Sequence, residues 1–207
     1  MARGGPPIRN AIDALQRLSN TELKPENYEA FFKEIGGVGS DRGAGILMVT
    51  SVEDTLQAAI ESRLSIPSDQ RDIFFGAVSP LGTFANKIRI GFALDIFDVK
   101  AKQNLTLLKA IRNAFAHSKI SIDFETSEIK MACDLLAMPA MPMMADETQM
   151  RWAPQQQRYK GRARFQVVCT GQAQAFSTYA FLANNRHLPS DQLDNRYETL
   201  VRPKPLG

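Results

Sequence analysis

The feature that most constrains this chain is a four-turn stretch, residues 105–118, whose two sides differ sharply in polarity. At the 100° per residue of an α-helix, one side is mostly apolar, suits a core and holds Asn104, Leu108, Ile111 and Phe115. The opposite side gathers polar and cationic side chains: Lys109, Arg112, Asn113 and His117. Because Asn113 and His117 are four residues apart, they should lie one turn above the other. We therefore expect an amphipathic helix that presents a cation, an amide and an imidazole to solvent or to a partner.

Helical periodicity recurs along the chain and predicts an all-α fold. Apolar residues at three- and four-residue steps predict four long helices, near residues 41–64, 80–97, 100–117 and 162–185. Shorter stretches predict further helices near residues 8–18, 25–35 and 125–136. Ser40 or Asp41 can cap the first long helix, and Ser79 followed by Pro80 is typical of a helix start. We expect an up-and-down helical bundle.

The chain should comprise the bundle, a connection and a C-terminal helix. Residues 1–136 are predicted to form the bundle, and residues 162–207 a helix that packs on it followed by a polar tail. Residues 137–161 connect them and are rich in methionine, proline and basic residues. The prolines of this connection exclude a continuous helix, and its methionines suit packing against apolar surface better than metal binding.

Composition indicates an ordinary globular protein. Of 207 residues, 44% are hydrophobic and 23% charged, and the net charge of +3 permits nucleic-acid contact without demanding it. The two cysteines, Cys133 and Cys169, form no CxxC pair, so we expect free, buried thiols in a reducing cytoplasm. No run approaches the roughly 18 apolar residues of a membrane span.

Several classes of chemistry lack their residues. The two histidines, His117 and His187, belong to no HExxH pattern or acidic pair, so we expect no metal site. The G-x-S-x-G turn of serine hydrolases is absent, as is the glycine fingerprint of dinucleotide-binding folds. We therefore expect no cofactor.

Two sequence blocks resemble a known family. The first, residues 80–94, contains PLGTFANKIR followed by GFAL, and the second, residues 111–117, reads IRNAFAH. In this order and at this spacing they resemble the mannitol operon repressor family over about residues 40–124. The second block also fits the Arg-(four to six residues)-His motif of the HEPN superfamily, including a polar residue after the arginine.

The resemblance implies a HEPN-like helical bundle, a homodimer and a role in transcriptional control. We find no short helix pair with a basic recognition face, so a helix-turn-helix reader of DNA is not expected. Regulation would then act through a protein partner or through contacts with RNA or DNA.

The superfamily motif also implies an alternative, a metal-independent ribonuclease whose catalytic residues would be Arg112, Asn113 and His117. RNA cleavage needs general acid–base groups and a cation near the phosphate, and a homodimer would supply the second acid–base group. Whether the protein is an enzyme stays open at this point. Asn113 and His117 can instead hydrogen-bond carbonyls at the helix end, and Arg112 can pair with Glu53 or Asp54. The same two acids can equally form a solvated helix face.

Basic residues outside this helix are candidates for an interaction or anion-binding surface. Six were selected: Lys87, Arg89, Arg158, Lys160, Arg162 and Arg164. No Asp or Glu occurs between Glu147 and Asp191, which favours a phosphate or nucleic-acid patch there. A solubilising basic loop is an equally good interpretation of the same residues.

Overall fold

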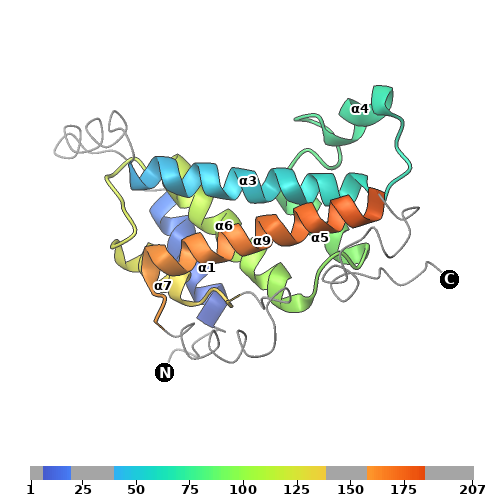
Figure 1. The fold of residues 1–207 in the computed structure, drawn as a ribbon. Helices are drawn as coiled ribbons and strands as arrows, with labels where there is room; N and C mark the ends of the chain where they lie inside the picture. The colour runs from blue at the N-terminus through green and yellow to red at the C-terminus, as the bar shows by residue number, and fades with distance from the viewer. Residues whose placement is uncertain (1–6, 20–39, 139–157, 185–207) are drawn as a thin grey trace, which may run out of the picture. The chain divides into compact units, whose positions relative to one another are not determined.

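The computed structural model describes residues 7–19, 40–138 and 158–184 (Figure 1). All regular secondary structure in these ranges is helical, which confirms the all-α prediction. The predicted helix at 25–35, most of the Met- and Pro-rich connection, His187 and the polar tail lie outside the described residues. Within these ranges, no helix has the length and apolar character needed to cross a membrane.

Apart from α5, the helices predicted within these ranges begin and end within three residues of their predicted positions. In chain order they are α1 (Pro7–Ser19), α3 (Asp41–Glu61), the 3₁₀-helix η2 (Ser68–Gln70), α4 (Arg71–Phe75), α5 (Phe84–Ala93), α6 (Val99–His117), α7 (Ser127–Asp134) and α9 (Gly161–Asn184).

These residues group into two compact units, and α3, α6 and α9 each contribute to both. The first unit contains, among the described residues, 7–19, 40–51, 103–138 and 159–169. The second contains 52–102, 158 and 170–184.

The first unit has an aromatic core beneath the last turns of α6. The ring centroids of Phe115 and Phe124 lie 5.1 Å apart, and those of Phe124 and Phe165 lie 5.0 Å apart in a tilted arrangement. Such tilted pairs add to the free energy gained from burying the rings. Gly45 of α3 lies so close to Phe115 that a methyl group there would overlap the ring. The absence of a side chain at Gly45 therefore lets the α3 backbone approach Phe115.

Asn104 is the polar residue on the predicted apolar side of α6, and it is buried as that placement requires. Its amide nitrogen donates to the carbonyl of Ala137 at 2.8 Å, and its oxygen accepts from the Ala137 N–H at 2.8 Å. A buried amide that satisfies both groups of one peptide residue fixes the chain after α7 against α6 without leaving unpaired polar atoms.

The second unit has its own aromatic cluster. Phe97 lies 6.2 Å from Phe92 and 5.7 Å from Phe176, between ring centroids. The ammonium group of Lys102 lies 3.9 Å from the centre of the Phe92 ring, a cation–π contact. Leu56 and Ile60 of α3 are fully buried in the same unit.

Helix α5 begins at Phe84, so the prediction of a helix start at Pro80 was wrong. Ser79 caps no helix, because its hydroxyl donates to the carbonyl of Asp72 at 2.9 Å. Thr83 is the cap instead, and its hydroxyl oxygen accepts from the Asn86 N–H at 3.2 Å. The Ser79 side chain therefore stabilises the loop before α5 rather than the start of the helix.

Helix α5 also ends earlier than predicted, at Ala93 rather than Ile96 or Phe97. Asp95 adopts a left-handed conformation with φ of 56°. The N–H of Ile96 bonds the carbonyl of Gly91 at 3.0 Å, and the N–H of Asp95 bonds that of Phe92 at 3.1 Å. This pair of bonds is the Schellman pattern of helix termination, formed here on an aspartate rather than the usual glycine.

Two other helix starts follow ordinary capping chemistry. Ser40 accepts the N–H of Gly43 at 3.0 Å and caps α3, as its position predicts. Asp98 accepts the N–H of Ala101 at 2.8 Å at the start of α6.

Candidate functional site: a polar groove beside α6

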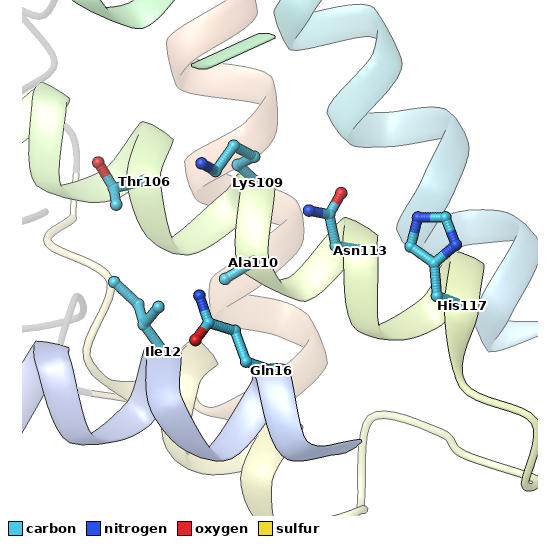
Figure 2. Close-up of a pocket in the computed structure, with 7 residues that line it drawn as sticks. All are labelled: Ile12, Gln16, Thr106, Lys109, Ala110, Asn113 and His117. Atoms are coloured by element: carbon cyan, nitrogen blue, oxygen red, sulfur yellow. The ribbon is translucent and has the colours of Figure 1, made fainter. Parts of the chain in front are cut away.

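The polar side of α6 lines a groove in the first unit, and α1 forms its other wall (Figure 2). The groove has a volume of about 250 Å³. Seven residues line it: Ile12, Gln16, Thr106, Lys109, Ala110, Asn113 and His117.

The helical period explains which residues meet here. On α6, Lys109, Asn113 and His117 recur at four-residue steps and therefore share one face. On α1, Ile12 and Gln16 are also four apart and face the groove together. Lys109 and Asn113 are half-buried, whereas His117 is exposed. The expected stacking of Asn113 and His117 on one polar face is present.

Arg112 is not among the residues that line the groove, although it was predicted as a site residue. It is half-buried, and its Nη2 donates to Oδ1 of Asn113 at 3.5 Å. With the amide oxygen engaged in this way, the amide nitrogen of Asn113 is directed toward the side of the groove where Lys109 lies (Figure 2). The cation in the groove wall is Lys109, one turn earlier.

A buried arginine holds the last turn of α6. Arg42 is 7% exposed, and its guanidinium donates to the carbonyls of Phe115, Ser118 and Ile120, the last two at 3.2 and 3.0 Å. These are carbonyls at and beyond the helix end, the kind that Asn113 and His117 were considered able to bond. Sequence reasoning missed Arg42, because nothing in the order of residues links it to carbonyls more than 70 positions away.

Lys87 was expected on a polar helix side and is instead buried. It is 6% exposed, and its Nζ lies 2.9 Å from Oε1 of Glu53 in an ion pair. The side chains of the pair are 7% and 13% exposed. Lys87 is therefore committed to Glu53 and offers no surface charge, whereas Asp54, the neighbouring acid on α3, is exposed.

The other predicted basic residues divide into two groups. Arg162 pairs with Asp41 at 2.5 Å, and Arg164 donates to the carbonyls of Leu136 at 2.7 Å and Tyr159 at 3.5 Å. Both bind other parts of their own unit. Arg158 and Lys160 are exposed, as is Arg89, which donates to Oδ1 of Asn86 at 3.1 Å. Near the start of α9, the exposed basic residues are therefore Arg158, Lys160 and Arg162.

The thiols of Cys133 and Cys169 are buried and free. Burial raises the pKa of the Cys133 thiol to about 12, and burial together with the nearby Cys133 raises the pKa of Cys169 as well. Thiolate chemistry is disfavoured at both positions. No group of three His, Cys, Asp or Glu residues within the described ranges is arranged to hold a metal ion.

Sequence reasoning placed Lys109 on the polar side of α6 but did not select it as a site residue, and it missed Gln16. Lys109 had a signal, since it precedes Asn113 by one turn on the same arc. Gln16 had none, because only the tertiary fold brings α1 beside α6.

Comparisons with protein-family models, with curated proteins and with solved structures found no match for this chain. The resemblance to the mannitol operon repressor family therefore rests on the two sequence blocks alone.

Proposed function

We propose that this protein is a cytoplasmic regulatory module of the mannitol operon repressor type. It would act as a homodimer, through contacts with a protein partner or with RNA, rather than by reading a DNA sequence. The observation that carries the proposal is the polar groove beside α6, which Asn113 and His117 of the second family-like block help to line. A groove lined by one lysine, two amides and an imidazole suits recognition of a polar partner.

The arrangement of the helices supports the part of this proposal that concerns DNA. A helix-turn-helix joins two helices by a turn of three or four residues. In the described ranges, the α-helices from α3 to α9 are separated by connections longer than such a turn. The one direct junction joins the 3₁₀-helix η2 to the five-residue α4. Neither of these short elements has the length to cross a major groove as a recognition helix.

Transcript profiling tests the regulatory role. Deletion of the gene from its host should change the transcript level of a sugar-uptake operon, and a His117→Ala variant should reproduce that change at normal protein abundance. An unchanged transcript profile after deletion would contradict the proposal. Selection from a random DNA duplex library should enrich no motif, and sedimentation at micromolar concentration should show a dimer.

A metal-independent ribonuclease is the second candidate, favoured by the exposure of His117 one turn from Asn113 in an open groove. An exposed imidazole can take the proton of a ribose 2′-hydroxyl, and a second protomer would supply the acid for the leaving oxygen. Arg112 and Lys109 provide cationic groups near the reacting phosphate.

Cleavage of a fluorescent RNA in the presence of EDTA tests this second candidate. The wild type should cleave, and His117→Ala and Arg112→Ala should each abolish cleavage while the circular dichroism spectrum and the dimer are retained. Identical traces for wild type and His117→Ala would remove the ribonuclease and leave the regulatory module.

A further inference from the structure

We propose that the groove between α1 and α6 binds the phosphate group of a small phosphomonoester metabolite. The proposal goes beyond a role in regulation or RNA cleavage, because it assigns a ligand class to the groove whether or not the protein dimerises. It rests on three properties of the groove: its charge, its hydrogen-bond donors and its size.

The charge of the groove favours an anion. Lys109 contributes a positive charge, and none of the seven lining residues is an acid. His117 adds an imidazole, a further group that can hydrogen-bond a ligand. A phosphomonoester carries close to two negative charges at neutral pH, whereas each phosphodiester of a nucleic-acid strand carries one. A groove that holds a lysine and no acid therefore suits a small anion of this kind.

The donors of the groove come from two helices that line the same pocket. The amide nitrogen of Gln16 points toward α6, and that of Asn113 points toward the side where Lys109 lies (Figure 2). The hydrogen bond from Arg112 to Oδ1 of Asn113 stabilises this orientation, because it keeps the acceptor end of the amide occupied. Phosphate oxygens accept several hydrogen bonds, and those from charged donors are the strongest.

The size of the groove limits the rest of the ligand. Its volume of about 250 Å³ falls below the roughly 300–1,000 Å³ of pockets that hold drug-sized molecules. Ile12 and Ala110 are its apolar lining, which suits a short carbon skeleton next to the phosphate. A nucleic-acid strand would extend well beyond the groove, so most of its affinity would have to come from other surfaces.

Calorimetric titration of the full chain in a phosphate-free buffer tests the proposal. The probes are ribose 5-phosphate, inorganic phosphate, ribose and a 2′-O-methyl octanucleotide that cannot be cleaved. Ribose 5-phosphate should bind more tightly than inorganic phosphate, and ribose should give no heat of binding. An octanucleotide that binds more tightly than ribose 5-phosphate, and is weakened by the groove variants below, would overturn the small-ligand proposal in favour of a nucleic-acid strand.

Charge variants locate the binding in the groove. Gln16→Glu introduces a carboxylate at an exposed position, so it should fold and should weaken ribose 5-phosphate binding by about tenfold or more. Gln174→Glu makes the same change on the exposed side of α9 and should leave binding unaltered. Lys109→Gln should weaken binding similarly, and Lys109→Arg should retain most of it. Binding that survives both Gln16→Glu and Lys109→Gln, or the absence of binding by every phosphate probe, would refute the proposal. Neither result depends on the dimer or on the transcript profile, so failure of the regulatory role would be seen separately.

Discussion

Two lysines, Lys87 on α5 and Lys109 on α6, lie in opposite environments. Lys87, in the first block, is 6% exposed and pairs with Glu53 at 2.9 Å. Lys109, just before the second block, is half-buried and lines a groove that contains no acid. Both residues lie on predicted polar helix sides, so helical position alone does not decide whether a lysine is structural or available to a ligand.

The difference comes from the neighbouring carboxylate. A buried ammonium group loses its hydration and needs a partner of opposite charge, which Glu53 supplies to Lys87. Lys109 keeps contact with solvent through the groove and can hold a charge without such a partner. The comparison indicates that Lys87 stabilises the fold, whereas Lys109 lines a groove together with Asn113 and His117 of the second block.

The largest expected effect is that of Lys87→Met, which removes one partner of the buried pair. The carboxylate of Glu53 would then lose its ammonium partner while still largely out of solvent, and the free energy of unfolding should fall by about 3 kcal/mol. Urea unfolding followed by circular dichroism measures this change.

The double variant Lys87→Met, Glu53→Met is the control for that prediction. Replacing both charges by apolar side chains of similar size removes the buried carboxylate as well, so much of the lost stability should return. If Lys87→Met alone is as stable as wild type, the assignment of a structural role to the first block is incorrect.

A second prediction concerns the core beneath the second block. Gly45→Ala places a methyl group against the ring of Phe115, and the resulting overpacking should outweigh the helix propensity gained, with a net loss of about 2 kcal/mol. Gly43→Ala is a matched control on the same helix, since its added methyl group would meet the Ser40 hydroxyl at 3.3 Å. Equal stabilities of the two variants would show that Phe115 can move aside.

Features of the fold that depend on residues close in sequence could be predicted, whereas features that depend on competing or distant contacts could not. The helical fold, the two-sided character of α6 and the Ser40 cap follow from local periodicity and capping chemistry, and the structure shows all three. Both ends of α5 were predicted wrongly. Ser79 bonds to Asp72 instead of capping the helix, and Asp95 ends the helix in a left-handed conformation. Several local hydrogen bonds compete at these ends, and the sequence does not show which of them forms.

The composition of the site could be predicted only in part, for the same reason. Asn113 and His117, selected as catalytic candidates because they share one face of a helix, both line the groove. Gln16 comes from α1, and the acid that neutralises Lys87 comes from α3. Contacts between distant segments depend on the tertiary packing, which spacing along one helix does not encode.

A third prediction uses the Cys133 thiol in the unit that holds the groove. An unfolded thiol titrates near 8.5, whereas burial raises the pKa of Cys133 to about 12. Between these values the unfolded chain binds fewer protons than the folded one, so stability should fall as the pH rises. At about pH 10 the wild type should have lost about 2 kcal/mol more than a Cys133→Ala variant, each measured relative to its own stability at pH 7. Parallel pH profiles for the two proteins would contradict the burial of this thiol.

The smallest expected effect is that of Lys109→Met, and it sharpens the comparison between the two lysines most directly. Methionine and lysine have similar helix propensities and lengths, and no carboxylate lines the groove that would be left without a partner. The free energy of unfolding should therefore change by less than about 0.5 kcal/mol, against about 3 kcal/mol for the identical substitution at Lys87. Urea unfolding of the two variants side by side measures the contrast. A large loss of stability in Lys109→Met would mean that this lysine, too, is structural, and the groove would then lack the available cation on which anion binding depends.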